Sequence, residues 1–292
     1  MKGAANMEWF VHAADGRTLA VEDAGDRDGR PVLVHVGTPA GRRLYGPRTL
    51  ADAERRQLRL ISYDRPGYGG STPQPGRSIA DCASDVRAIC AALGIDRLAM
   101  WGLSGGGPHV LACAALLPDL VTAAASLASL APYDAEGLDW LAGFSAEAIE
   151  EVRLTLGDRT KARAWFRQEC AEILGAPPAQ LALKWQAQMP GVDLALLTDE
   201  AVSMQQALAP GIEGSWDDCV AQLTPWGFDV AQISIPVLLL HGGQDRAVPF
   251  SHGQWLASHI PGVEARFFPD EGHALRDSHI EDVDAWLVER SS

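Results

Sequence analysis

The sequence predicts an α/β fold built around a mainly parallel sheet. Short apolar or β-branched runs alternate with stretches of helical periodicity along most of the 292 residues, which is the pattern of strands connected by helices. Apolar residues make up 47% of the chain and charged residues 21%, the balance of a globular protein with a packed core. A single domain with one large insertion is the natural expectation at this length.

The first two strands are predicted as an antiparallel pair. Residues 8–14 and 18–25 are strand-like, and Asp15 and Gly16 supply the turn between them. The chain then alternates between buried strands and helices. Further strands are predicted at 31–37, 58–66, 97–104, 121–130, 235–245 and 264–273. Helices are predicted at 44–56, 79–93, 108–117 and 282–290.

Helix 79–93 has the clearest end signal, because its apolar periodicity stops at Gly94. The alternation itself stops from 132 to 229, a proline-containing stretch of helix-like pieces. We interpret 132–229 as an insertion into a core formed by 1–131 and 230–292. Its tryptophans are expected to build the insertion's own small core, with several large side chains lining a pocket where it meets the sheet. The candidates for substrate contact are Tyr133, Trp140, Phe144, Trp165, Trp185 and Met204.

Charge and hydropathy exclude several partners. The formal net charge is −14, which disfavours nucleic acid and anionic membrane surfaces because they carry the same sign. No apolar stretch is long enough to cross a bilayer, and the first residues lack the apolar segment of a signal peptide. We therefore expect a cytoplasmic protein that acts on a small molecule.

The five cysteines predict buried thiols and no disulfide framework or metal site. They are odd in number and show no CxxC spacing. They are Cys82, Cys90, Cys113, Cys170 and Cys219.

The segment "GLSGG" predicts a nucleophile at Ser104. It follows a strand and precedes a helix, the context in which G-x-S-x-G forms a sharp turn. Bulky residues at 102 and 106 would collide across such a turn, and glycine removes the collision. The turn also places Ser104 at a helix N-terminus, where backbone N–H groups favour developing negative charge.

A serine alcohol needs a base, and the base needs an orienting acid. His273 is the predicted base, because it follows the last strand and Gly272 permits a tight loop. His109 lies close to Ser104 on the following helix and is expected to serve packing. The remaining histidines, His241 among them, have no converging partner in the pattern.

Asp245 is the predicted acid. It follows the strand before the one that precedes His273, in a loop with glycines before it and a proline after it. Asp134, just past strand 121–130, is the rival acid. For the oxyanion we expect backbone donors from Thr38, in the glycine-rich loop after strand 31–37, and from Gly105.

With these pieces in order, the chain resembles the α/β-hydrolase superfamily over nearly its full length. "HVGTP" resembles the family's His-Gly-x-Pro loop, and "YDRPGYGGS" resembles its D-x-x-G-x-G-x-S loop. "GLSGG", "GGQDRAVP" and "EGH" resemble its nucleophile, acid and base segments. The resemblance implies a mostly parallel eight-stranded sheet, with 132–229 as a helical cap. One departure is visible, because Val36 stands where the family usually has histidine.

The sequence hypothesis is a serine hydrolase that cleaves a carboxylic ester, lactone, thioester or small amide, without a cofactor. The serine at 104 disfavours epoxide hydrolases and haloalkane dehalogenases of this fold, which use aspartate there. A proline iminopeptidase-like aminopeptidase is the enzymatic alternative, and a cofactor-free lyase or a ligand receptor is the alternative from another class. An aminopeptidase needs acidic groups in the insertion, where we expect a solvated acidic face. The candidates are Asp193, Asp199, Glu200, Glu213, Asp217 and Asp218.

Overall fold

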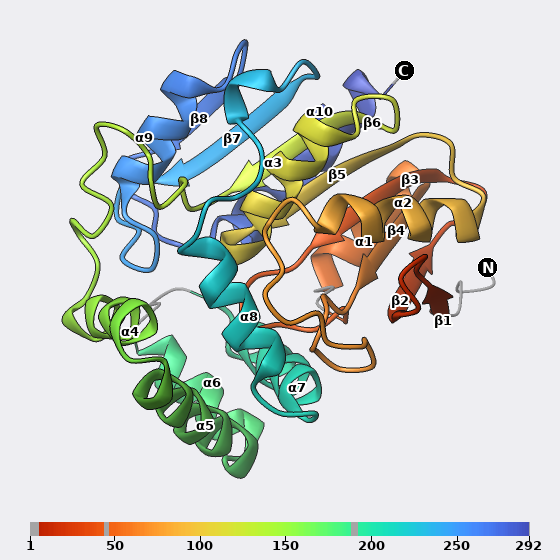
Figure 1. Ribbon diagram of the computed structural model, residues 1–292. Coiled ribbons are helices and arrows are strands. Elements are labelled where there is room, and N and C mark those ends of the chain that lie inside the picture. The colour runs from red at the N-terminus through yellow and green to blue at the C-terminus, as the bar shows by residue number, and fades with distance from the viewer. Residues whose placement is uncertain (1–5, 44–46, 188–191, 292) are drawn as a thin grey trace.

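A single twisted sheet organises the molecule in the computed structural model, which describes residues 6–43, 47–187 and 192–291. In this part of the chain the sheet has eight strands in the order β1-β2-β4-β3-β5-β6-β7-β8 (Figure 1). The pairs β1–β2 and β2–β4 are antiparallel, and every other neighbouring pair is parallel. The predicted α/β class and mainly parallel sheet are confirmed.

The strands lie close to their predicted ranges. They are β1 Met7–His12, β2 Thr18–Gly25, β3 Arg30–His35, β4 Leu58–Tyr63, β5 Leu98–Leu103, β6 Val121–Leu127, β7 Val237–Gly242 and β8 Glu264–Phe268. The helices outside 132–229 are α1 Pro47–Arg56, α2 Cys82–Leu93, α3 Gly107–Leu116, α9 Phe250–His259 and α10 Leu275–Arg290. Residues 44–46, the start of the helix expected over 44–56, lie outside the described residues.

Several element boundaries differ from the prediction, and helix α9 was not predicted. Strand β6 ends at Leu127 because Ala128 adopts a φ of 47°, which no strand continues. Helix α2 begins at Cys82, after a turn in which the Asp81 carboxylate accepts hydrogen bonds from the backbone N–H and the hydroxyl of Ser78. Helix α10 begins at Leu275, earlier than the expected 282.

Alternating strand residues divide the apolar core between the two faces of the sheet. Leu33 and Met100 belong to the cluster under α2, α3 and α9, whereas Val34 and Trp101 belong to the cluster under α1 and α10. Both faces are therefore covered by helices, as a parallel sheet requires. No helix in the described ranges is long and apolar enough to cross a membrane.

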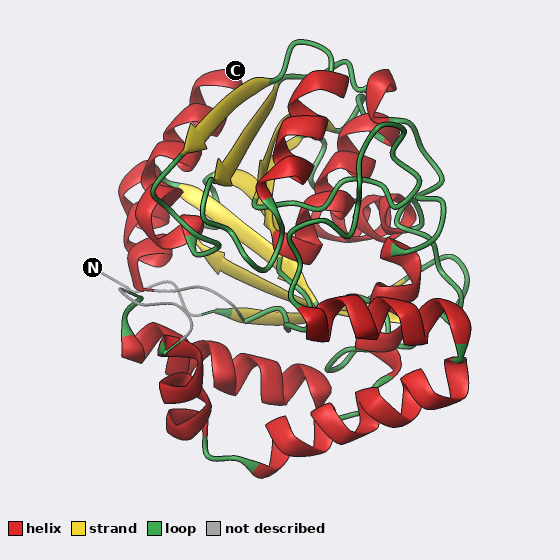
Figure 2. Cartoon of the chain, turned by 90° about the vertical axis from the view of Figure 1, so that its left-hand side faces the viewer, coloured by secondary structure: helices red, strands yellow, loops and turns green. Residues whose placement is uncertain are grey.

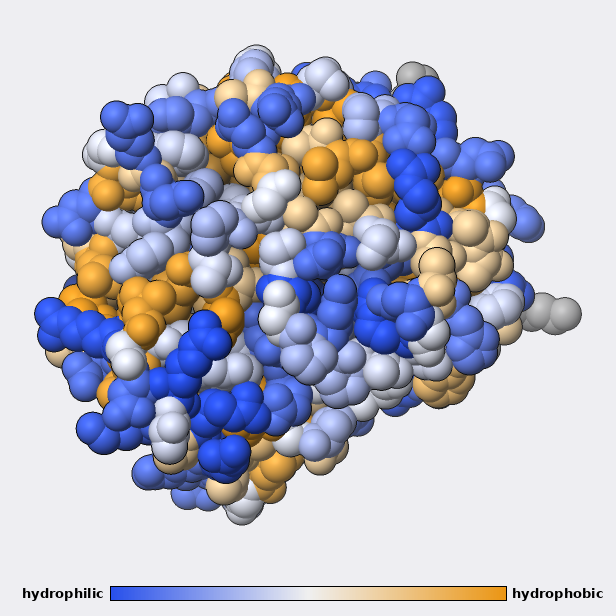
Figure 3. All heavy atoms as spheres, in the orientation of Figure 1, coloured by the Kyte–Doolittle hydropathy of each residue, from blue (hydrophilic) through white to orange (hydrophobic). Residues whose placement is uncertain are grey.

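Five helices, counted over the described residues, lie between β6 and β7 and are called the insertion below. They are α4 Ala146–Gly157, α5 Arg159–Gly175, α6 Pro178–Gln186, α7 Leu194–Leu208 and α8 Glu213–Gln222. Figure 2 shows them as a layer across one end of the sheet. On the face seen in Figure 3, hydrophilic residues cover much of the insertion, and hydrophobic residues gather beside α4, close to the rest of the molecule.

The turn from β5 into α3 is sterically tight. Ser104 has a φ of 54°, in the left-handed region that side chains rarely adopt. A Cβ at position 102 would lie 2.7 Å from the Gly106 carbonyl oxygen, and one at 106 would overlap the carbonyl oxygen of His35. The glycines flanking Ser104 are therefore required by backbone contacts, as predicted from the motif.

We predict that Gly106→Ala lowers the free energy of unfolding by about 1–3 kcal/mol, because its methyl group meets backbone that cannot rotate away. Thermal unfolding measures the loss. Gly157→Ala is the matched control, since a Cβ there meets nothing within 4 Å. Equal unfolding temperatures for the two variants would contradict the steric argument.

A carboxyl pair lies between α1 and α10. Asp284 is fully buried, and no described donor reaches either of its oxygens. Burial, together with the neighbouring Asp52 carboxylate, raises the pKa of Asp284 well above its ordinary value. Asp52 itself is paired with Arg55 and Arg56. Burial and the Asp52 carboxylate therefore favour the protonated form of Asp284 in the folded protein.

This raised pKa makes stability depend on pH with a definite sign. The unfolded Asp284 loses its proton above a pH of about 4, whereas the folded one keeps it, so its contribution is lost as pH rises. We predict that Asp284→Asn gains unfolding temperature over the wild type between pH 5 and pH 8, by about 2 °C or more. Asp282→Asn is the matched control, because Asp282 is exposed on the same helix, and it should show the wild-type pH dependence. If Asp284→Asn also shows the wild-type pH dependence, Asp284 is ionised in the folded protein and the prediction is wrong.

Candidate active site

The predicted nucleophile, acid and base all follow strand ends at one edge of the sheet. Leu103 of β5 is in register with Leu127 of β6, which is in register with Leu240 of β7. Strand β8 pairs with β7 up to Gly242 and Phe268. Ser104, Asp245 and His273 therefore follow strands β5, β7 and β8 at the same edge of the sheet. Neighbouring strands in a sheet are about 4.8 Å apart.

The structure brings Asp245 and His273 together. His273 Nδ1 lies 2.8 Å from Asp245 Oδ2, and the Asp245 side chain is completely buried. The other carboxylate oxygen accepts the backbone N–H groups of Ala247 and Val248, both at 2.9 Å. The carboxylate is thus fixed by its own loop before it contacts the histidine. The rival acid Asp134 is exposed.

His241 was wrongly expected to lack a converging partner. Its Nε2 lies 3.6 Å from Asp245 Oδ2 and 3.0 Å from the Val248 carbonyl oxygen. Burial lowers the pKa of His241, so the ring is neutral beside the carboxylate. Its side chain is completely buried beside the acid.

Ser104 is partly exposed, in contrast to the buried glycines that follow it. Among the described residues, its hydroxyl makes no hydrogen bond with His273. The structure therefore places the predicted nucleophile at the same sheet edge as the acid–base pair without joining it to them.

The two predicted oxyanion donors are neighbours. A Cβ at position 105 would overlap Thr38 Oγ1 and lie 2.9 Å from Gln222 Nε2, so the loop after β3 packs directly on the turn after β5. A Cβ at position 37 would lie 3.6 Å from the Ser104 Cβ. Within the described chain, the Thr38 backbone N–H has no backbone acceptor. Thr38 and Gly105 thus flank Ser104.

A buried ion cluster under this loop was missed from the sequence. Asp218 of α8 is completely buried and accepts hydrogen bonds from Arg65 Nη2 at 2.6 Å and Arg77 Nη2 at 2.6 Å. The hydroxyls of Thr38 and Tyr68 also donate to it, at 2.9 and 3.1 Å. Burial acts to raise the pKa of Asp218, but the two guanidiniums outweigh it and hold that pKa below its usual range.

The expectation of a solvated acidic face is wrong for Asp217 and Asp218, which are 4% and 0% exposed and contact Arg77 in the interior. Glu200 is half-buried and pairs with Arg276. Asp193 and Asp199 are exposed, as expected. Single-sequence patterns could not reveal the pairing, since 153 residues separate Arg65 from Asp218.

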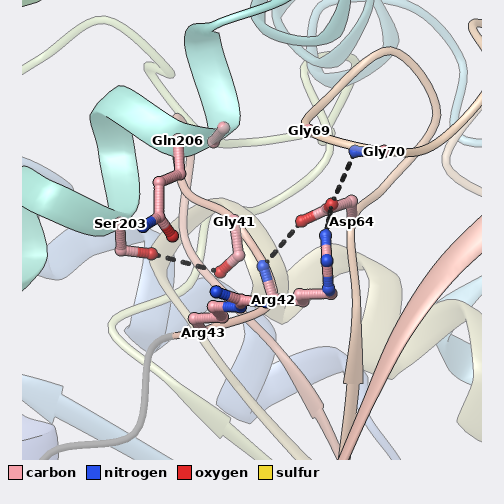
Figure 4. Close-up of a pocket in the computed structure, with 9 residues that line it drawn as sticks. Gly41, Arg42, Arg43, Asp64, Gly69, Gly70, Ser203 and Gln206 are labelled. Carbon is pink, nitrogen blue, oxygen red and sulfur yellow. Dashed lines mark hydrogen bonds and ion pairs between the residues drawn. The ribbon is translucent and has the colours of Figure 1, made fainter. Parts of the chain in front are cut away.

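The D-x-x-G-x-G-x-S motif ties together the loops behind the site. The Asp64 carboxylate accepts the backbone N–H groups of Arg42 at 2.8 Å and Gly70 at 2.9 Å, and it also pairs with the Arg42 guanidinium (Figure 4). A Cβ at position 69 would overlap this carboxylate. Ser71 donates to the Asp64 carbonyl oxygen at 2.6 Å. The motif is therefore a brace for neighbouring backbone.

A polar cavity of about 250 Å³ lies beside this brace, against α7. Ser203 and Gln206 of α7 face Arg42 and Arg43 across it (Figure 4). Neither Ser104 nor His273 lines this cavity. Its arginines are engaged with Glu8, Glu22 and Asp64, so we assign no catalytic role to it.

The aromatic candidates fall into separate groups. Trp140 packs against Tyr133 and Phe144, with ring centroids 5.3 and 5.1 Å apart, and its Nε1 donates to the Ala131 carbonyl oxygen. Trp165 instead contacts Phe166 inside the insertion. Trp185 and Met204 lie on α6 and α7 and are partly buried. The first group leads from β6 towards α4. Among the described residues, no hydrogen bond joins any of these candidates to Ser104.

All five cysteines are free and buried, as predicted. His35, Cys82 and Cys113 place their ligand atoms within 4.8 Å of one another, which makes them the residues that would hold a metal ion in the described chain. Burial raises the pKa of the Cys82 thiol well above its ordinary value, so a metal would have to displace that proton. His109 is buried as expected, with a pKa lowered by burial to about 3, and its Nδ1 lies 2.9 Å from the Gly105 carbonyl oxygen.

Comparison with known proteins gives a consistent family. The non-heme chloroperoxidase of Streptomyces lividans is 26% identical over 253 residues, covering 82% of this chain and 83% of the relative. The bifunctional esterase/perhydrolase DCH of Acinetobacter calcoaceticus is 25% identical over 286 residues, covering 96% and 98%. The crystal structure of the esterase RhEst1 from Rhodococcus sp. ECU1013 superposes with a TM-score of 0.69 at 20% identity, covering 97% of this chain and 99% of that one.

The sequence profile described as alpha/beta hydrolase fold matches residues 30–279. This match spans strands β3 to β8 with the connections between them. The chain belongs to the α/β-hydrolase fold family.

Proposed function

We propose that the protein is a serine hydrolase that cleaves a carboxylic ester, lactone, thioester or small amide through an acyl-enzyme on Ser104. The observation that carries the proposal is the 2.8 Å hydrogen bond between His273 and a fully buried Asp245. It is made at the edge where the β5–α3 turn presents a partly exposed serine at a φ of 54°. A histidine bound through Nδ1 keeps Nε2 for proton transfer.

Each residue has one role in this proposal. Ser104 Oγ attacks the substrate carbonyl carbon while His273 Nε2 takes its proton, and Asp245 stabilises the imidazolium that forms. The backbone N–H groups of Thr38 and Gly105 donate to the oxyanion. His273 returns the proton to the leaving group, and water then hydrolyses the acyl-enzyme by the same route. The Ser104–His273 contact forms when substrate binds, as catalytic hydrogen bonds often do.

The insertion serves in this proposal as a cap that binds the acyl or ring group of the substrate. Two features support an apolar preference: the partly exposed Tyr133 and Phe144 beside Trp140, and the hydrophobic residues that gather near α4 (Figure 3). The esterase/perhydrolase named among the relatives supports an ester as the first substrate to test.

We predict that Ser104→Ala lowers kcat on a short-chain p-nitrophenyl ester by about 10⁴-fold or more, and Asp245→Asn by about 10⁴-fold. Both variants should fold normally, which thermal unfolding checks. Asp134→Asn is the matched control for the acid, because Asp134 is exposed, and its rate should stay within about twofold of wild type. Full activity of Ser104→Ala, or an equal loss in Asp134→Asn, would contradict the assigned roles.

The aminopeptidase alternative loses support from the buried cluster. Asp218, one of the acidic candidates for binding a free amino group, is already engaged by Arg65 and Arg77. We predict that kcat/KM on a p-nitrophenyl ester exceeds that on an N-terminal proline p-nitroanilide by about 10²-fold or more. A faster reaction with the proline substrate would favour the aminopeptidase.

A further inference from the structure

Arg65 holds the backbone of the loop between β3 and α1. Its Nη1 donates to the Val36 carbonyl oxygen at 2.5 Å, and its Nη2 donates to the Gly37 carbonyl oxygen at 2.8 Å. The same Nη2 lies 2.9 Å from Thr38 Oγ1. A planar guanidinium therefore contacts three consecutive residues, two of them through backbone carbonyls.

These carbonyl contacts fix the direction of a neighbouring donor. The peptide bond between Gly37 and Thr38 is trans, since the cis bond in this loop follows Thr38. In a planar trans peptide the C=O and N–H bonds point in opposite directions. Because the Gly37 carbonyl points at Arg65, the Thr38 N–H points away from Arg65. The same loop also lies close to Ser104, because a Cβ at position 37 would be 3.6 Å from the Ser104 Cβ.

Asp218 holds Arg65 in turn, and it comes from the insertion. It accepts from Arg65 Nε at 3.0 Å and Nη2 at 2.6 Å, which is a side-on contact with one edge of the guanidinium. Both side chains are buried, at 1% and 0% exposure, so neither is free to rotate into water. Removing either partner would leave a buried charge uncompensated.

We propose that Arg65 is a positioning residue that aims the Thr38 N–H at the oxyanion, and that Asp218 of α8 locks it there. The insertion thereby controls the oxyanion hole as well as covering the site. This inference rests on the proposed hydrolase function. It also gives the loop a hydrogen-bonding partner in a chain where Val36 replaces the usual histidine.

Arg65→Lys tests the proposal, because lysine keeps the charge but cannot bridge two carbonyls and a carboxylate. The expected result is a fall of about 10- to 100-fold in kcat on the p-nitrophenyl ester, less than the loss of a whole oxyanion donor, with KM within about twofold. Affinity for a trifluoromethyl ketone, which forms a tetrahedral oxyanion on the serine, should fall by the same factor as kcat.

Arg77→Lys is the matched control. Arg77 binds the same carboxylate, at 2.6 Å, and the Gly214 carbonyl oxygen at 3.1 Å. It makes no contact with the backbone of 36–38 in the described chain. Both variants should lose stability, but only Arg65→Lys should lose kcat and ketone affinity. Equal losses of kcat in the two variants would assign Arg65 a merely structural role and overturn the proposal.

A structure of the wild-type protein with the ketone bound keeps the test independent of variant folding. The adduct oxygen should lie within hydrogen-bond distance of the Thr38 and Gly105 nitrogens while the Gly37 carbonyl stays on Arg65. An adduct oxygen that does not reach Thr38 would overturn the inference. Labelling of Ser104 by a fluorophosphonate distinguishes failure of the positioning role from failure of the proposed hydrolase function. If Ser104 is labelled and Arg65→Lys keeps the wild-type kcat, only the positioning role is refuted. If Ser104 of the wild-type protein is not labelled, the hydrolase function itself is refuted.

Discussion

The left-handed backbone of Ser104 is the constraint on which the site depends. A φ of 54° is costly for a residue with a side chain, and close contacts within the turn and from the loop after β3 hold it. The His35 carbonyl lies against Gly106, the Gly106 carbonyl against Gly102, and Thr38 against Gly105. The same contacts that store this strain bring the loop after β3 beside the serine. The strain at Ser104 and the position of the loop after β3 thus depend on the same packing.

Two buried carboxylates support that arrangement in different ways. Asp245 is held by backbone N–H groups of its own loop and presents one oxygen to His273. Asp218 is held by two arginines and reaches the oxyanion loop through Arg65 and Thr38. In the proposed mechanism the first orients a base and the second orients backbone. Asp245 follows strand β7 and Asp218 lies on α8, so the sheet and the insertion each contribute to the proposed site.

The features that the sequence predicted are those determined by interactions between residues close together in the chain. The glycine-flanked serine, the Gly94 helix end and the strand order of Ser104, Asp245 and His273 follow from turn sterics and from strands that end at one sheet edge. The Arg65–Asp218 pair could not be predicted, because acidic residues on a helix usually face solvent and nothing nearby in the sequence marks Asp218 as buried. The end of strand β6 could not be predicted either, because it depends on the φ of 47° at Ala128.

The central claim is that a covalent acyl group forms on Ser104. Its most direct test is to quench the protein during turnover of a p-nitrophenyl ester and map the acyl group by peptide mass spectrometry. We expect an acylated peptide that contains Ser104 and decays as the ester is consumed. An acyl group on another residue, or steady turnover with no acylated peptide under quenching fast enough to trap it, would rule out the proposed mechanism.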